Sequence, residues 1–258
     1  MKITSLLENT TEREDIKVEH GLSLYIETNS HKILFDMGQT DYFYENARTL
    51  GIDLANVDIA ILSHGHYDHG GGLGKFLEIN DHAPIYINKD AFLPHYNGED
   101  KYIGLDTSLA INSRIIFTYD EYSINASLSL FSCNDRKRKH KMLESGLTEK
   151  VGDSFVPDDF RHEQYLLIKE NGKSILISGC SHKGILDITH WVCPDVIIGG
   201  FHYSKLALDS YLENAAKELA SYKTEFYTCH CTGCEQFEFM RRYLPSLHYL
   251  SCGQSITI

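Results

Sequence analysis

Short apolar runs alternate with polar and amphipathic segments along the whole chain. The runs are rich in valine, isoleucine, leucine and phenylalanine, which favours buried strands. They cover residues 21–28, 31–38, 57–62, 126–131, 165–168 and 196–201. Apolar positions recur at helical spacing in Ser210–Ala220, and a second helix is predicted over Glu235–Leu244, ending before Pro245. The pattern therefore predicts mixed α and β structure in which helices flank sheets.

The composition is that of a globular chain with one core. The sequence has 258 residues, 42% of them hydrophobic, and shows no low-complexity tract or internal repeat, so we expect a single domain over residues 1–258. No apolar stretch approaches the ~20 residues that span a bilayer, and the segment after Met1 turns polar too soon for a signal peptide. The seven cysteines are odd in number and irregularly spaced. We therefore expect a cytoplasmic protein that does not associate with membranes.

The segment Ser63–Gly72 follows the predicted strand at residues 57–62 and holds three imidazoles and a carboxylate within six residues. Side chains two apart on extended backbone point the same way, so His64 and His66 are able to share one metal ion. Asp68 and His69 follow on a turn that aims them at a second position. The glycines after them allow positive φ and close backbone approach. The alternative is a run of solvated surface histidines.

His64-x-His66-x-Asp68-His69 after an apolar strand resembles the metal-binding signature of the metallo-β-lactamase superfamily of hydrolases. The Phe-Asp-x-Gly sequence that ends the preceding predicted strand is also typical of it. The resemblance implies an α+β fold, an αββα four-layer sandwich with metal ions at one edge of two central sheets. It also implies that Asp36 lies beneath the metal loop and orients its ligands. A plain turn or cap role is the alternative for Asp36.

Three further motifs follow apolar runs in order, at residues 177–185, 199–202 and 230–233. The set resembles the subgroup related to dihydropterin ribofuranosylaminobenzene phosphate synthases, which implies that His182 and His230 complete the ligands of a dinuclear site. Many relatives carry Gly-Asp where this chain has Gly179-Cys180. Cys180 is therefore either a thiolate ligand or a buried thiol beside the site. His162, near the position of a third histidine in several relatives, is the alternative to His182.

Other residues of these motifs are candidates for substrate contacts. His202 is predicted to touch the substrate or donate a proton, with a packed histidine as the alternative. Thr232 and Gly233 are predicted to open a helix with backbone N–H groups available to an anion. A zinc knuckle formed by the neighbouring cysteines is disfavoured, because only one further cysteine follows and a structural zinc needs a second ligand pair. These cysteines are Cys229, Cys231 and Cys234, followed by Cys252.

The formal net charge of −12 argues against nucleic-acid binding, which relies on lysine and arginine to neutralise phosphates. The exception is the basic segment Arg136–Lys141, which is either a solvated loop or a region that attracts an anionic substrate. The span from about residue 91 to 159 has no superfamily metal motif. We expect it to form a subgroup-specific insertion over the site.

Together these features predict a metal-dependent hydrolase that uses two divalent ions, with zinc favoured over manganese or iron, on a small anionic substrate such as a phosphoester. Asp68 would bind the second metal and orient the attacking hydroxide, while His202 would steady the leaving group. Oxygen-reducing iron relatives carry glutamate in place of the second histidine, whereas this chain has His66. The alternatives are a synthase acting on a pterin diphosphate and a non-catalytic metal sensor. The sequence leaves the oligomeric state open.

Overall fold

The computed structural model describes residues 1–258, which divide into two compact units. Unit 1 consists of Met1–Tyr119, Glu144–Gln164 and Ser251–Ile258, and unit 2 consists of Asp120–Leu143 and Tyr165–Leu250. Each unit has its own central sheet and its own hydrophobic core. The single domain predicted over residues 1–258 stays a prediction.

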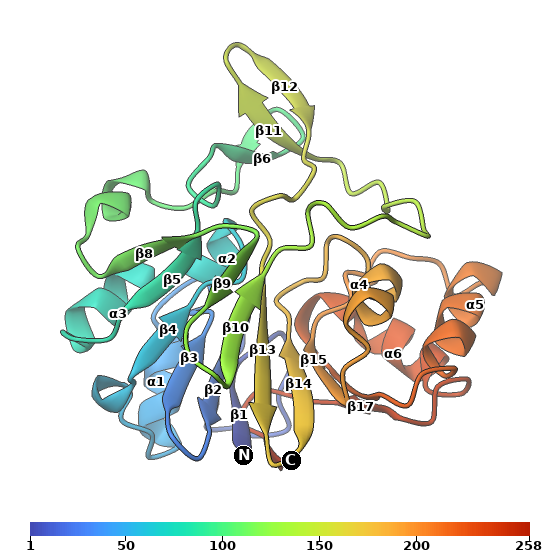
Figure 1. Cartoon of the computed structure of the whole chain (residues 1–258), viewed down its shortest axis with the longest axis horizontal. Helices are drawn as coiled ribbons and strands as arrows, with labels where there is room; N and C mark the ends of the chain where they lie inside the picture. Colours follow the sequence, from blue (N-terminus) through green and yellow to red (C-terminus); the bar gives the residue numbers. More distant parts are fainter. The chain divides into compact units, whose positions relative to one another are not determined.

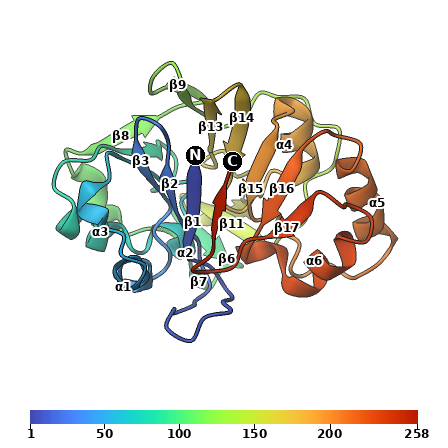
Figure 2. The same cartoon turned by 90° about the horizontal axis from the view of Figure 1, so that it is seen from below.

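The main sheet of unit 1 has seven strands in the order β18-β1-β2-β3-β4-β5-β8. The strands are β1 (Lys2–Leu7), β2 (Ser23–Glu27), β3 (Lys32–Phe35), β4 (Ile59–Ile61), β5 (Ile85–Asn88), β8 (Ile115–Thr118) and β18 (Ser255–Thr257). Strands β3, β4, β5 and β8 run parallel, and the others pair antiparallel. Because β1 pairs with β18, the two termini lie side by side (Figure 2).

Helices cover one face of this sheet, where α1 and α3 lie together in Figure 2. The helical segments of unit 1 are α1 (Tyr42–Thr49), η1 (Leu54–Asn56), α2 (Tyr67–Gly70), α3 (Leu73–Ile79) and η2 (Thr107–Ile111). Phe43 of α1 and Phe76 of α3 are fully buried and pack in one core with Leu34, Ala60 and Ile85 of the strands. Burying apolar side chains between these layers stabilises the sheet from which the histidine motif emerges.

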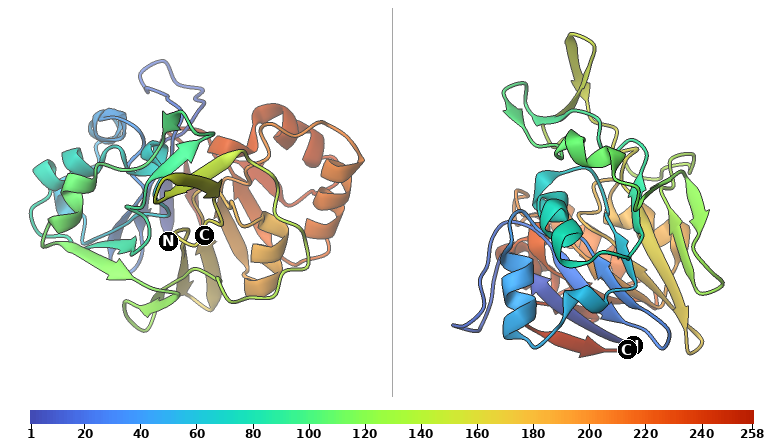
Figure 3. Two further views of the ribbon diagram at one scale, coloured as in Figure 1. Left: turned by 90° about the horizontal axis from the view of Figure 1, so that it is seen from above. Right: turned by 90° about the vertical axis from the view of Figure 1, so that its left-hand side faces the viewer.

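A second, four-stranded sheet of unit 1 has the order β12-β11-β6-β7 and lies apart from the main one (Figures 1 and 3). Its strands are β6 (His95–Asn97), β7 (Lys101–Tyr102), β11 (Leu147–Val151) and β12 (Ser154–Pro157). We call it the small sheet. All four strands fall in the span from about residue 91 to 159 that was predicted to be an insertion, but the same span also supplies β8 to the main sheet and β9 and β10 to unit 2. The span is therefore not one separate cover.

The sheet of unit 2 has seven strands in the order β17-β16-β15-β14-β13-β10-β9. They are β9 (Glu121–Ser123), β10 (Leu128–Phe131), β13 (Tyr165–Glu170), β14 (Lys173–Ile177), β15 (Val196–Gly199), β16 (Glu225–Thr228) and β17 (Leu247–Tyr249). Strands β14 to β17 are parallel, so their carboxyl ends meet at one edge of the sheet. In open sheets of this kind, that edge is where ligands bind.

One face of the unit 2 sheet is covered by α4, α5 and α6 (Figure 2). The helical segments are α4 (Ile185–Val192), α5 (Ser210–Leu219), η3 (His230–Thr232) and α6 (Cys234–Met240). The predicted helix at 210–220 agrees with α5, which begins after Asp209, whose side chain accepts a hydrogen bond from the Tyr211 N–H. The helix predicted to reach Leu244 ends at Met240. No helix of the structure combines the length and the apolar character needed to cross a membrane.

Candidate metal centre

The motif residues 63–72, here called the histidine loop, leave the main sheet of unit 1 directly after β4. His66 is still extended, with φ −96° and ψ 146°, and the one-turn helix α2 then carries Asp68 and His69. The ring of His64 lies 4.6 Å from that of His66 and 4.1 Å from that of His69, measured between centroids. The structure therefore brings the three loop histidines together, with His66 on extended backbone and His69 on the one-turn helix.

The glycines of the histidine loop permit close packing and not the positive φ angles that were predicted. Gly71 has φ −60° and Gly72 has φ −76°, both accessible to any residue. A Cβ at Gly71 would lie 2.3 Å from the Gln39 carbonyl oxygen, and one at Gly72 would lie 2.3 Å from the Met37 carbonyl oxygen. These positions are glycine because other backbone segments press directly against the loop.

Asp36 lies beneath the histidine loop, as the superfamily resemblance implied. Its Oδ2 is 2.7 Å from His69 Nδ1 and 2.8 Å from the Ser63 hydroxyl, and its Oδ1 accepts the Ser63 backbone N–H at 2.7 Å. The residue is fully buried and has φ +60°, an uncommon conformation for a non-glycine residue. A carboxylate only accepts, so Nδ1 of His69 carries the proton and Nε2 keeps a lone pair.

Ser63 fixes His64 in the same way. The Ser63 hydroxyl donates to Asp36, so its oxygen is left to accept from His64 Nδ1 at 2.8 Å. Nε2 of His64 then also keeps a lone pair. The rings of His64 and His69 thus each have an unprotonated Nε2. The Asp36 carboxylate and the Ser63 hydroxyl, which fix these tautomers, belong to one buried hydrogen-bond network.

Asp68 is the motif carboxylate and is 7% exposed. Its Oδ2 lies 3.2 Å from Nε2 of His20 and 3.7 Å from Nε2 of His69. His20, whose side chain is 56% exposed, was not predicted from the sequence as part of this region. No motif marks it, because it reaches Asp68 from the segment before β2.

His162 lies close to the histidine loop, yet its ring nitrogens are both engaged. Nδ1 accepts the backbone N–H of Gly65 at 2.9 Å, so Nε2 carries the proton and lies 3.3 Å from Asp158 Oδ2. The ring therefore has no lone pair left for a metal ion. This hydrogen bonding argues against His162 as the third histidine ligand.

Two buried residues near His162 were missed by the sequence analysis. His95 Nδ1 lies 2.9 Å from Asp158 Oδ2, and the rings of His95 and His162 are 3.9 Å apart. Burial alone would raise the pKa of Asp158, but hydrogen bonds from His162 and His95 hold it below its usual range. The only sequence signal was the presence of Asp158 four residues before a candidate histidine.

The predicted residues of unit 2 follow three parallel strands. Cys180 and His182 come after β14, His202 after β15 and His230 after β16, which places them at the carboxyl edge of the sheet. The rings of His182 and His202 are 4.3 Å apart. Donor atoms of Cys180, His202 and Cys231 lie within 4.8 Å of one another, all in buried or half-buried residues. Cys180 thus belongs to a group that also contains Cys231, which the sequence analysis had not connected with it.

Backbone strain gathers at the same edge. Ser181, His202 and His230 have φ +58°, +56° and +50°, in the left-handed region that non-glycine residues seldom adopt. Such conformations are costly and persist where the surroundings hold a side chain in a required place. Each of the three lies in a motif that the sequence analysis singled out.

The backbone N–H of Thr232, predicted to be available to an anion, is engaged within the protein. The Thr232 backbone N–H donates to the Cys229 carbonyl at 3.2 Å, and its hydroxyl accepts the Phe201 N–H at 2.9 Å. The residue is fully buried and so has no N–H to offer an anion. Gly233 precedes α6, and its predicted contact with substrate stays a prediction.

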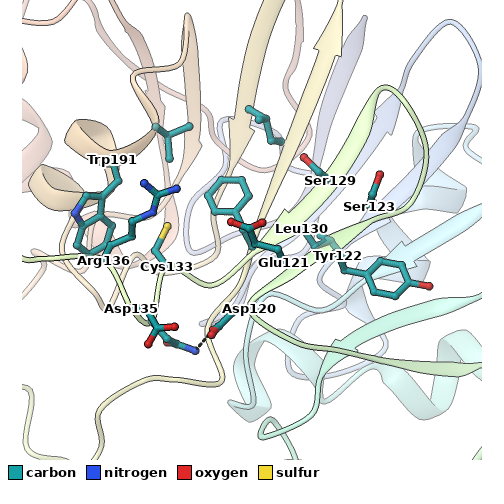
Figure 4. Close-up of a pocket in the computed structure, with 14 residues that line it drawn as sticks. Asp120, Glu121, Tyr122, Ser123, Ser129, Leu130, Cys133, Asp135, Arg136 and Trp191 are labelled. Carbon is teal, nitrogen blue, oxygen red and sulfur yellow. Dashed lines mark hydrogen bonds between the residues drawn. The ribbon is translucent and has the colours of Figure 1, made fainter.

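The basic segment Arg136–Lys141 packs against α4 and α5 of unit 2. Arg138 Nη1 donates to the Lys183 carbonyl at 2.6 Å and lies 3.5 Å from Asp187, while His140 lies 2.9 Å from Glu218. Arg136 lines a cavity of ≈ 760 Å³ beside Trp191 and Cys133 (Figure 4). None of the predicted metal ligands lines this cavity.

A sequence profile of the metallo-beta-lactamase superfamily matches residues 16–184, which include the histidine loop and the Cys180–His182 motif. The chain belongs to the metallo-beta-lactamase superfamily. An uncharacterized protein of Methanocaldococcus jannaschii is 31% identical, over 90% of each chain. The same organism's 7,8-dihydropterin-6-methyl-4-(beta-D-ribofuranosyl)-aminobenzene-5'-phosphate synthase is 27% identical, over 92% of this chain and 90% of its own.

A solved structure shows the same fold. The crystal structure of Tm1679, described as a metal-dependent hydrolase of the beta-lactamase superfamily, has a TM-score of 0.86 and 28% identity, and the match covers 100% of this chain and 99% of that one. The chain therefore has the metallo-beta-lactamase fold, of mixed α and β structure. The predicted subgroup also agrees with the named synthase among its relatives.

The residues of the histidine loop fit the divalent ions that superfamily members usually bind. The ring nitrogens and the Asp68 carboxylate are donors that zinc, manganese and iron accept, and the loop histidines are buried. Their tautomers are set so that Nε2 of His64 and His69 faces away from Asp36 and Ser63 with a lone pair. The donor set alone does not select among these metals.

Proposed function

We propose that this protein is a metal-dependent hydrolase of a small anionic substrate, a phosphoester. The observation that carries the proposal is the fixed tautomer of the loop histidines. Asp36 and Ser63 hold Nδ1 of His69 and His64, so both rings keep an Nε2 lone pair for a cation. Surface histidines without a metal role need no such buried carboxylate.

In this proposal His64 and His66 bind one ion, while Asp68 and His69 bind the second. When bound, two divalent ions, zinc in preference to manganese or iron, activate water and stabilise negative charge that develops on the substrate. Asp68 is proposed to orient the attacking water, because its carboxylate is slightly exposed and lies 3.7 Å from Nε2 of His69. His182 and His230 remain the proposed further ligands, with Cys180 as an additional one.

The proposed contact with the substrate and the proposed substrate class rest on His202 and on the net charge. His202 is proposed to steady the leaving group, since its strained backbone holds the ring beside that of His182. The net charge of −12 supports a small molecule over a nucleic acid. Seven cysteines, all without disulfides, support a location in the reducing cytoplasm.

The first test is the metal content of the purified protein. Elemental analysis should give about two zinc or manganese ions per chain, the number that a dinuclear site holds. Asp68→Ala should retain the first ion, lose the second, and lower turnover of a phosphodiester and phosphomonoester panel by orders of magnitude. His182→Ala should reduce the metal content, whereas His162→Ala should lower the metal content less, because the engaged ring nitrogens of His162 make it no proposed ligand.

Each outcome decides a part of the proposal. Full activity and normal metal content in Asp68→Ala would remove this residue from the site. Metal loss in His162→Ala but not in His182→Ala would mean that His162, and not His182, is the third histidine ligand. A wild-type protein that binds no metal would overturn the proposed function, and one that binds two ions without turning over any ester would favour a metal sensor.

A second candidate function is favoured by the synthase relative. That enzyme is named for making an aminobenzene ribofuranosyl phosphate linked to a dihydropterin, and it aligns over 92% of this chain. The same ions and histidines would then assist the departure of diphosphate from a pterin diphosphate. Incubation with a dihydropterin diphosphate and the aminobenzene partner, followed by mass analysis, separates the two. A coupled pterin product means synthase, and release of diphosphate without coupling means hydrolase.

A further inference from the structure

Several of the polar groups around His66 come from outside the histidine loop. Asp36 and Ser63 hold His69 and His64 from within the main sheet and the loop itself. Donor atoms of His66 lie instead within 4.8 Å of those of His95, Asp158 and His162. The His66 ring is 5.6 Å from that of His95 and 5.3 Å from that of His162. The surroundings of His66 thus depend in part on residues about 30 and 90 positions further along the chain.

A single carboxylate connects this group. Asp158 Oδ2 lies 2.9 Å from His95 Nδ1 and 3.3 Å from His162 Nε2, and Oδ1 accepts the Phe160 backbone N–H at 2.7 Å. The side chains of Asp158, His95 and His162 are all fully buried. Each hydrogen bond in such a network is strengthened by the low local dielectric, so the rings have little freedom to turn.

The group is not itself a second metal site, although its four donors lie close together. His162 uses both ring nitrogens, and both oxygens of Asp158 accept hydrogen bonds from the protein. Only Nε2 of His95 is left as a buried atom without a hydrogen-bond partner among these three residues. One free nitrogen does not make a coordination shell. The group is built to hold rings in place.

We propose that Asp158 is the positioning residue for His66, acting through His95 and His162, whereas Asp36 contacts His69 directly. The inference rests on the proposed metal site. His162 contributes twice, because it contacts the His66 ring and holds the preceding Gly65 by its backbone N–H. His95, with Nδ1 protonated toward Asp158, presents the acceptor lone pair of Nε2 inside the same buried group.

The same network attaches the small sheet to the histidine loop. His95 is the first residue of β6 and Asp158 follows the last residue of β12, and both strands pair with β11. The His95–Asp158 hydrogen bond therefore closes the base of the small sheet directly beside His66. Any loosening of that sheet is transmitted to one of the proposed ligands.

The test compares two neighbouring aspartates. Asp158→Asn keeps the size of the side chain but replaces one accepting oxygen with a donating amide, which conflicts with the N–H groups around it. Asp159→Asn is the matched control, since the Asp159 side chain is 59% exposed and pairs only with Arg161. Binding of Co²⁺ to the metal-free proteins is measured by competition titration, and the melting temperature of each metal-free variant is recorded beside it.

We expect both Asp158→Asn and Asp36→Asn to bind Co²⁺ about 10- to 100-fold more weakly than wild type, with Asp159→Asn unchanged. His95→Gln, which keeps a polar side chain, should weaken binding in the same direction and serves if Asp158→Asn does not fold. A lowered melting temperature with wild-type Co²⁺ affinity in either folded variant would overturn the proposal, because the network would then be only structural. Absence of Co²⁺ binding by the wild type would instead overturn the proposed function.

Discussion

His66 is buried between other ionisable side chains, and its protonation is therefore coupled to folding. Burial lowers the pKa of His66 well below its usual value, and repulsion from His162 lowers it further. The unfolded chain takes up a proton on this histidine below about pH 6.5, whereas the folded protein does not. Proton uptake by the unfolded state then favours unfolding as the pH falls.

The stability of the metal-free protein should accordingly be steady above about pH 6.5 and fall below it, by at most about 1.4 kcal/mol per pH unit from this residue. Urea unfolding of the metal-free protein, repeated from pH 8 to pH 5 in steps of roughly half a pH unit, measures how the free energy of unfolding changes with pH. His66→Gln should make the slope shallower by that amount, while His82→Gln, at an exposed position, should leave it as it is. An unchanged slope in His66→Gln would show that His66 is protonated in the folded state.

The sequence was informative about residues whose partners lie nearby along the chain. His64, His66, Asp68 and His69 were predictable because one strand end and one turn orient all four. Asp36 required a family resemblance, since it is 33 residues from His69. His95 and Asp158 are 63 residues apart and belong to no motif, so only the folded structure reveals their hydrogen bond. The spacing of residues within a segment predicts which way their side chains point, but it does not predict which distant strands pair.

At the level of elements, the histidine loop is held against the turn that follows β5. A Cβ added at Gly65 would lie 2.1 Å from the Ala91 carbonyl oxygen and 2.8 Å from its carbonyl carbon. Neither group belongs to a flexible side chain, so the backbone itself would have to move. Gly65 also donates its N–H to His162, which makes this contact a second connection between the loop and the Asp158 network.

Gly65→Ala should therefore destabilise the protein by about 1–3 kcal/mol and weaken metal binding. Gly74→Ala is the control, because Gly74 is exposed in α3 and its added Cβ would have only a Leu109 methyl at 4.0 Å. That change should instead stabilise by about 0.5–1 kcal/mol. Denaturant unfolding and metal titration of both variants measure the two effects. Equal stabilities would mean that the Ala91 turn yields easily.

The strands of the small sheet and the edge strands of the larger sheets were not predicted from the sequence. Strands β4 and β15 are buried along their whole length, and their apolar runs were visible in the sequence. Strand β9 is three residues long and mostly exposed, and β7 has two exposed residues. Such edge strands carry no apolar pattern, because neighbouring backbone alone defines them. For that reason the span around residues 91–159 looked like one insertion.

At the level of the whole molecule, the charge of −12 opposes the approach of the anionic substrate that we propose. The repulsion acts over roughly a Debye length, which shrinks to about 8 Å at 0.15 M salt. Basic residues of Arg136–Lys141 offset it only in part, because Arg138 is paired with Asp187. The long-range field should therefore slow substrate association.

For a phosphomonoester, kcat/KM should rise a few-fold at most between low ionic strength and about 0.15 M salt, since screening reduces the repulsion, while kcat stays constant. A neutral ester hydrolysed by the same protein should show no such rise. Steady-state kinetics at constant metal content measures both. A kcat/KM that falls with salt would mean that local positive charge outweighs the net charge, and Arg136→Gln, on the exposed part of the basic segment, would then flatten the dependence.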